Sequence, residues 1–117
     1  MTRFSDLKGL TITGIIGATP DSERIVFKSS DGRQFLMYHY QACCENVSLE
    51  SVDGDVNDLI GSEILQAEEE SNHSETEEGS QTWTFYKIAT VKGYVTLRWF
   101  GSSNGYYAES VDFEEMT

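Results

Sequence analysis

Positive charge is missing from the middle of this 117-residue sequence. No lysine or arginine occurs between Arg33 and Lys87, although the chain has eight of them in all. The same interval holds twelve of the twenty acidic residues, and the other eight balance the eight basic ones, so the net charge of -12 lies there. Binding to nucleic acid or to an anionic membrane needs clustered Lys and Arg, so neither is an expected direct partner.

Cysteine, proline and long apolar runs are also scarce. The only cysteines, Cys43 and Cys44, are adjacent, and neighbouring Cα atoms lie about 3.8 Å apart, closer than the roughly 4.4–6.8 Å of most disulfides. We therefore predict that both are reduced and not bonded to each other.

No segment resembles a signal peptide or a membrane span. We expect one domain, residues 1–117, in the cytoplasm of a cell or of an infected cell.

Short alternating segments rich in β-branched and aromatic residues predict strands in the first half of the chain, over 10–16, 24–28, 34–39 and 46–50. Asp31-Gly32 is typical of a tight hairpin between the second and third of them. One short helix is expected near Val56–Ile60, with Asp55 as its N-cap and Gly61 at its end. The polar stretch 71–80 lacks apolar periodicity and is predicted to be a mobile acidic loop.

The last third of the sequence predicts a three-stranded meander. Its strands are expected over 82–90, 94–100 and 106–111, with Asn104-Gly105 as the second turn. The fold class is therefore mainly β (α+β), a twisted antiparallel sheet that is barrel-like or sandwich-like. The predicted core comprises Trp83, Phe85, Val95, Leu97 and Trp99, with Phe27, Phe35 and Ile60 packed nearby.

Two groups of residues suggest a metal or catalytic site. The first group, His39, Cys43 and Cys44, contains residue types that bind zinc. Zinc sites usually take their ligands from two segments, however, and here there is only one. Buried thiols beside a histidine at the edge of the core are the simpler interpretation. Glu45 and the lack of nearby cations also disfavour a reactive thiolate.

The acidic pattern Asp53, Asp55 and Asp58 fits helix capping better than a calcium loop, which would need further oxygen ligands. We expect no metal, no cofactor and no catalytic residue, and hence a protein that is not an enzyme.

The acidic side chains that follow the helix have two interpretations. They are either a solvated surface that keeps the protein soluble, or a contact surface for a basic partner, because like charges at this density repel one another and cost stability. As a contact surface, the candidate partner-binding residues are Glu63, Glu68, Glu69, Glu70, Glu75, Glu77 and Glu78.

A second candidate site lies near the expected meander turn. Tyr combined with Ser, Gly and Asn is typical of adaptable contact loops, although a plain hairpin whose tyrosines pack on the sheet explains the same residues. The alternative ligand-binding or contact residues are Arg98, Trp99, Ser103, Asn104, Tyr106 and Tyr107.

Several motifs together resemble a small uncharacterised domain family found in bacteriophages and bacteria. They are His39-x3-Cys43-Cys44-Glu45, Trp83-Thr84-Phe85-Tyr86 and Ser103-Asn104-Gly105-Tyr106-Tyr107. The resemblance implies no activity, only that a phage origin is plausible.

The leading hypothesis for the function is a small acidic protein that binds other proteins, in its sharpest form a phage-encoded inhibitor of a basic, nucleic-acid-handling host protein. The alternatives are a small-molecule (nucleotide-like ligand) binding domain with an aromatic pocket and an uncatalogued enzyme.

Overall fold

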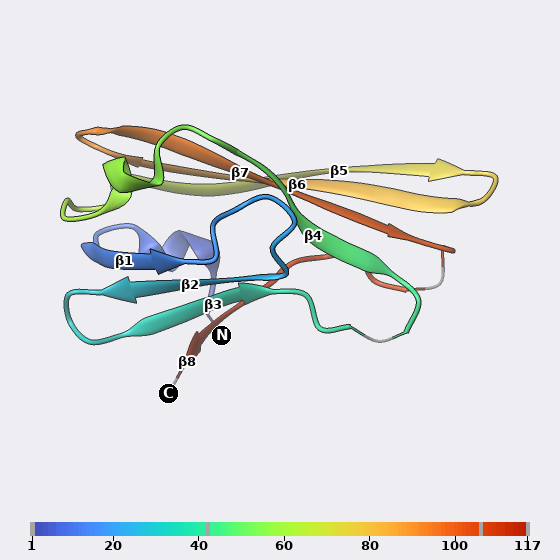
Figure 1. Ribbon diagram of the computed structural model, residues 1–117, viewed down its shortest axis with the longest axis horizontal. Helices are drawn as coiled ribbons and strands as arrows, with labels where there is room; N and C mark the ends of the chain where they lie inside the picture. Colours follow the sequence, from blue (N-terminus) through green and yellow to red (C-terminus); the bar gives the residue numbers. More distant parts are fainter. Residues whose placement is uncertain (1, 42, 106, 117) are drawn as a thin grey trace.

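The computed structural model describes residues 2–41, 43–105 and 107–116. Two four-stranded antiparallel sheets face each other, with strand orders β1-β2-β3-β8 and β4-β7-β6-β5 (Figure 1). The elements are η1 (Phe4–Leu7), β1 (Ile12–Ile16), β2 (Arg24–Ser29), β3 (Gln34–Tyr38), β4 (Asn46–Asp53), η2 (Val56–Leu59), β5 (Gln66–Thr76), β6 (Gly79–Thr90), β7 (Gly93–Ser103) and β8 (Asp112–Met116). This confirms the predicted mainly-β, antiparallel fold. Of the two expected forms, barrel-like and sandwich-like, the two facing sheets fit the second.

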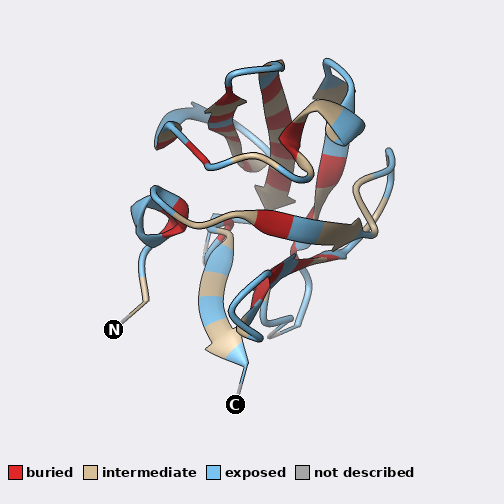
Figure 2. Ribbon diagram, turned by 90° about the vertical axis from the view of Figure 1, so that its left-hand side faces the viewer, coloured by how far each residue is buried: buried red, intermediate tan, exposed pale blue. Residues whose placement is uncertain are grey.

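The core lies between the two sheets, where the buried parts of the strands face one another (Figure 2). Trp99 of β7 is only 1% exposed, and its Nε1–H donates to the Met37 sulfur of β3 at 3.1 Å, which links the sheets. Phe4 of η1 closes one side of the core, with its ring centroid 4.6 Å from that of Tyr86. Because aromatic and aliphatic side chains fill this layer, their burial is the main stabilising contribution.

Local sequence signals in the first half are confirmed. β2 and β3 pair from Arg24↔Tyr38 to Lys28↔Gln34, and the connecting turn contains Gly32 at φ +89°. The expected helix is a single 3₁₀ turn rather than an α-helix, and the Asp55 carboxylate accepts the Asn57 N–H at 2.9 Å as its N-cap.

The predicted C-terminal meander is wrong in its third strand. β6 and β7 form two of its strands, but the third is β5, which precedes them in the sequence. The described residues of 106–111 form no strand (Tyr106 itself lies outside the described residues), and the chain crosses to the other sheet, where β8 pairs with β3. Asn104-Gly105 does turn the chain, but a local turn signal does not determine which sheet the chain joins next.

The segment 71–80, predicted as a loop, is instead the end of β5, a two-residue turn at Glu77 and Glu78, and the start of β6. The pairing of β5 with β6 continues without interruption from Gln66↔Ala89 to Thr76↔Gly79. Polar residues have low strand propensity, but cross-strand pairing along a partner of good propensity overrides it.

The predicted core is correct for Val95, Leu97 and Trp99 but wrong for Trp83 and Phe85. On β6 the even-numbered residues Thr84 and Tyr86 are buried, so their odd-numbered neighbours face outward and are half-buried. Trp83 packs there on Phe100, with ring centroids 5.0 Å apart.

The buried residue of η2 is Leu59, whereas Ile60, predicted to lie in the core, is only half-buried. Phe27 and Phe35 are buried as predicted. Among the described residues, no helix has the length and apolar character needed to cross a bilayer.

Candidate functional site: a polar groove and an acidic edge strand

The inner face of the second sheet changes character halfway along its strands. On β6, Ile88 and Tyr86 point into the core, and the next two residues of the same face, Thr84 and Thr82, carry hydroxyl groups. Because side chains two apart share a face, β5 changes in the same way after Ala67. Its inner residues from there on are Glu69, Ser71, His73 and Glu75.

Gly105 and the segment from Tyr107 to Val111 line the other side of a groove of about 470 Å³ that this polar half forms. Gly101 of β7 is buried beneath that segment, and a Cβ atom there would lie 2.8 Å from the Glu109 carbonyl oxygen. A larger residue at this strand position would therefore push the segment away from the sheet.

Glu109 is the buried charge at one wall of the groove, with a side chain only 3% exposed. Its carboxylate accepts hydrogen bonds from Ser80 and Ser103, both at 2.5 Å, and from Thr82 at 2.8 Å. Burial raises the pKa of Glu109, but the hydrogen bonds from the three hydroxyls together outweigh it, so the pKa is lowered overall. The three hydroxyls therefore hold Glu109 as an anion.

His73 lies beside this cluster and is half exposed. Its Nδ1 is 2.9 Å from the Thr82 Oγ1 and 3.8 Å from the Glu109 carboxylate. Since Thr82 donates its only hydroxyl hydrogen to Glu109, its oxygen accepts from His73. In this arrangement the Nδ1 atom of the imidazole is therefore the donor toward Thr82.

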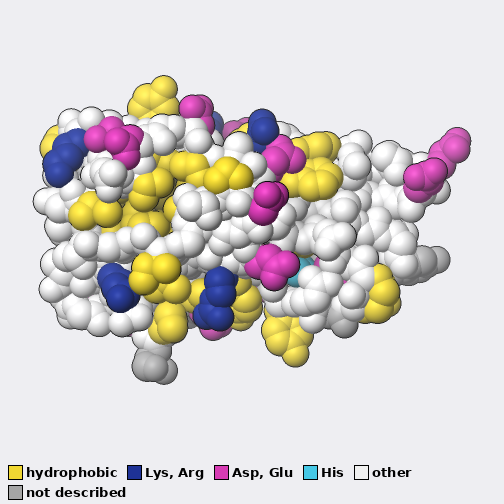
Figure 3. All heavy atoms as spheres, in the orientation of Figure 1, with side chains coloured by type: hydrophobic (Ala, Val, Ile, Leu, Met, Phe, Trp, Pro, Cys, Tyr) yellow, Lys and Arg dark blue, Asp and Glu magenta, His cyan; other side chains and the backbone are white. Residues whose placement is uncertain are grey.

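β5 places the predicted partner-binding carboxylates on two faces and a turn. Glu69 and Glu75 face the groove, and Glu68 and Glu70 face the opposite side of the sheet. The two glutamates at 77 and 78 form the turn. All of β5 from residue 68 onward is exposed, and the β5–β6 hairpin projects from one end of the molecule with acidic side chains at its tip (Figure 3). Glu63 lies outside β5, and its backbone forms an isolated antiparallel β-bridge with Thr11.

The acidic strand does have a partner cation, although the sequence interval around it contains none. Lys87 of β6 lies directly opposite Glu68, and its Nζ is 3.5 Å from the Glu70 carboxylate. Within the described residues, no Lys or Arg nitrogen comes within 4.0 Å of Glu69, Glu75 or the turn carboxylates at 77 and 78. The carboxylates of the groove face and the tip therefore form no ion pair with a described Lys or Arg, although the His73 Nε2 lies 3.7 Å from the Glu75 carboxylate.

The alternative aromatic pocket is not assembled as predicted. Arg98 and Trp99 point to opposite faces of β7: Trp99 is in the core, whereas the Arg98 Nε is 2.7 Å from the Glu50 carboxylate on the outer face. Ser103 binds Glu109, and the half-buried Tyr107 lines the groove.

Asn104 is exposed at the turn that follows β7. Tyr106, the last member of that predicted set, lies outside the described residues.

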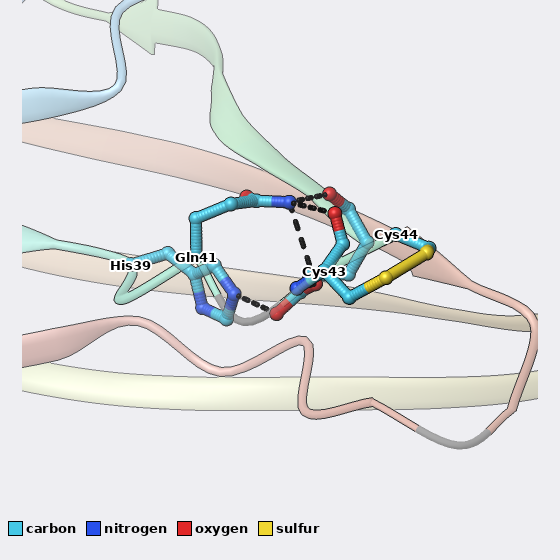
Figure 4. Close-up of a disulfide and its surroundings, with 5 residues drawn as sticks. His39, Gln41, Cys43 and Cys44 are labelled. Atoms are coloured by element: carbon cyan, nitrogen blue, oxygen red, sulfur yellow. Dashed lines mark hydrogen bonds and ion pairs between the residues drawn. A yellow bond between two sulfur atoms is a disulfide. The ribbon is translucent and has the colours of Figure 1, made fainter.

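The prediction of free cysteines is wrong, because Cys43 and Cys44 are joined by a disulfide, with Cα atoms 3.7 Å apart (Figure 4). Both residues are exposed rather than buried, and they lie in a bend between β3 and β4. Outside a strand, successive side chains are not forced to opposite sides, so two adjacent sulfur atoms can meet.

His39 is buried beside this bend, with its side chain 4% exposed. Its Nδ1 donates to the Ser110 carbonyl at 2.7 Å, and its Nε2 lies 2.8 Å from the Glu45 carboxylate, which also accepts the Cys43 N–H. Because these contacts tie the bend to the segment that covers the groove, His39 has a structural role. The described residues contain no cluster of three or more metal-binding side chains.

Sequence reasoning missed four groove residues: His73, Ser80, Thr82 and Glu109. One signal was present, because hydroxyl residues recur at every second position from Ser80 to Thr84 and so share one face of a strand. The aromatic residues that alternate with the last of them, Trp83 and Phe85, led to the prediction that the opposite face is buried.

The fold and the groove define a small two-sheet β domain with a polar groove and an acidic edge strand. The chain belongs to a family described as a domain of unknown function (DUF7448), whose model matches residues 5–113. This confirms the expected membership of an uncharacterised domain family. No curated protein and no solved structure matches the chain.

Proposed function

We propose that this protein binds another protein through the acidic β5 strand and the β5–β6 turn. The observation that carries the proposal is the position of the carboxylates. They stand on an exposed, projecting hairpin, and among the described residues no Lys or Arg nitrogen lies within 4.0 Å of the carboxylates at Glu69, Glu75 and the turn. A surface of one charge sign steers and selects partners of the opposite sign, so the partner surface is basic.

In its sharpest form the proposal is a phage-encoded inhibitor of a host protein that handles nucleic acid. Carboxylates along β5 would occupy the Lys and Arg side chains that otherwise hold phosphates, in the cytoplasm of the host cell. Two features support this form: the resemblance to a family found in bacteriophages and bacteria, and the net charge of -12. Nucleic acid itself is not a direct partner, because the acidic surface repels phosphates.

The test is a pull-down from host lysate with the wild-type protein and a triple variant, Glu68→Lys, Glu69→Lys and Glu70→Lys. Individual exposed charge pairs contribute only about 0.2–1 kcal/mol, so all three are reversed together. We expect the wild type to retain a basic protein at low salt and to release it at high salt, and the triple variant to retain none.

The matched control reverses three exposed carboxylates that lie off the hairpin, Glu23, Asp53 and Glu114, for the same change in net charge. This control should retain the partner. Equal retention by all three proteins would show that the acidic strand is only a solvated surface.

A polar small molecule in the groove is the second candidate function. The favouring observation is the groove itself, with Tyr107, hydroxyl groups and His73 along its walls. Glu69 and Glu75 make it a poor site for phosphate groups, so a nucleotide-like ligand is disfavoured. Binding in the groove would change little with ionic strength, whereas binding to the acidic strand weakens steeply.

A further inference from the structure

β5 is an open edge of the second sheet. β6 is its only strand partner among the described residues, so the other side of β5 presents main-chain N–H and C=O groups that no strand pairs. η1 packs against the beginning of β5, beside Ala67 and Glu69. The open part of the edge therefore runs from about Glu70 to Thr76.

The other three sheet edges are protected in different ways. β4 has an irregularity in its register after Leu49. The Leu49 N–H donates to the Ser22 carbonyl at 2.8 Å, and the Leu49 carbonyl accepts the Asp21 N–H at 2.7 Å. The beginning of the β1 edge is occupied by the β-bridge between Thr11 and Glu63 and by the Gly61 N–H, which donates to the Ile12 carbonyl at 2.8 Å. β8 has only five residues, three of them acidic. β5 has eleven residues, and its part from about Glu70 to Thr76 stays available.

We propose that this edge takes up an extended basic segment of the partner as a fifth strand of the second sheet. The inference rests on the proposed function and specifies its partner: a segment in which Lys or Arg alternates with β-branched apolar residues. Main-chain hydrogen bonds to β5 provide the attachment, and alternate side chains provide the selectivity.

Charge decides which face the basic side chains take. A strand added beside β5 places every second side chain over the groove, next to Glu75 and, at the start of the open part, near Glu69. Among the described residues, no Lys or Arg nitrogen lies within 4.0 Å of either carboxylate. On the opposite face Lys87 already neutralises Glu70 and lies opposite Glu68. Lys or Arg of the partner is therefore favoured on the groove side, and the apolar residues on the other side.

A second copy of this chain is a poor occupant of the same edge. Pairing two β5 strands would bring glutamates of one copy close to glutamates of the other, and like charges across paired strands are destabilising. The net charge of -12 on each copy adds to this repulsion.

The probe is a seven-residue peptide of alternating Lys and Val, acetylated and amidated, with binding measured by titration calorimetry at low salt. Two further peptides carry N-methyl groups, one on all Lys and the other on all Val. A strand bound by one edge directs the N–H groups of alternate residues to its partner. We therefore expect one methylated peptide to lose at least about tenfold in affinity and the other to bind within about threefold of the parent.

Two charge-matched double variants test the choice of face. Glu69→Gln with Glu75→Gln changes the groove face, and Glu68→Gln with Glu70→Gln changes the opposite face. We expect the groove-face variant to lose about fivefold in affinity for the parent peptide and the other variant less than about twofold. Equal losses would overturn the assignment of the basic residues to the groove side.

The strand-addition inference fails if both methylated peptides bind as tightly as the parent, if no peptide binds, or if a dimer formed through β5 excludes the peptide. None of these outcomes bears on the pull-down with the charge-reversed protein, which judges the proposed function separately. If the pull-down is positive but both methylated peptides bind equally well, the proposed acidic contact surface is supported and the proposed strand addition is contradicted.

Discussion

The two halves of the second sheet are stabilised by different interactions. In one half the inner face carries Tyr86, Ile88, Val95 and Leu97, which are buried against the first sheet. In the other half the inner residues of β5 and β6 are mostly hydroxyls and carboxylates, and Ser80 and Thr82 of β6 donate to the Glu109 carboxylate together with Ser103 of β7. The same strands run through both halves, so the change lies in the side chains and not in the backbone.

This difference shows how a small domain can keep a polar surface without losing its fold. The apolar half supplies the burial that stabilises the sandwich. The polar half is held by hydrogen bonds to one buried anion, and it leaves a groove and an open strand edge accessible. The polar surface and the stabilising core are thus separated along the length of β5 and β6.

The largest effect should come from Trp99→Ala in the apolar half. We expect a loss of about 3–5 kcal/mol in the free energy of unfolding, because a fully buried aromatic is removed. Trp83→Ala on the outer face is the matched control and should cost about 1–2 kcal/mol, since that side chain is half-buried. Urea unfolding measures both, and a loss below about 1 kcal/mol for Trp99 would contradict its place in the core.

Glu109→Gln tests the polar half and should cost about 1–3 kcal/mol at neutral pH. Its carboxylate accepts from three hydroxyls, and the amide nitrogen of a glutamine would be a donor facing donors. Denaturant unfolding gives the value. An unchanged stability would show that the hydroxyl cluster does not stabilise the fold.

Acidification should remove the same contribution from the wild-type protein. The folded-state pKa of Glu109 is lowered, so its stabilisation is present above its unfolded pKa of about 4.3 and is lost as the pH falls through the folded value. Unfolding curves of the wild type and of Glu109→Gln, measured from pH 7 down to about pH 3, should therefore converge. A difference in stability that stays constant with pH would contradict the ionised, hydrogen-bonded state.

The smallest effect on stability is expected for the triple reversal Glu68→Lys, Glu69→Lys and Glu70→Lys. These side chains are exposed, and Glu70 loses only its contact with Lys87 while repulsion among the glutamates is relieved. We expect a change within about 0.5 kcal/mol, measured by thermal and denaturant unfolding. A larger loss would mean that the acidic strand supports the fold, and a binding defect of this variant would then need another explanation.

Much of the local structure could be predicted from the residues. Asp31-Gly32 marked the β2–β3 hairpin, and Asp55 marked the start of η2. The acidic stretch 71–80 could not be recognised as strand, because its structure depends on pairing with β6 rather than on its own propensity. Glu109 could not be assigned to the site for a related reason, since its hydroxyl partners lie on β6 and β7.

The sequence by itself determined that this is a small, strongly acidic, mainly β chain whose negative charge lies in its middle. Alternation indicated where most strands run, because that period is a local property of the backbone. Only the tertiary structure decided which of two alternating faces is buried, so that Thr84 is inside and Trp83 is outside. It also brought Glu109 to the hydroxyls and left β5 at an open edge, since both depend on contacts between segments distant in the chain.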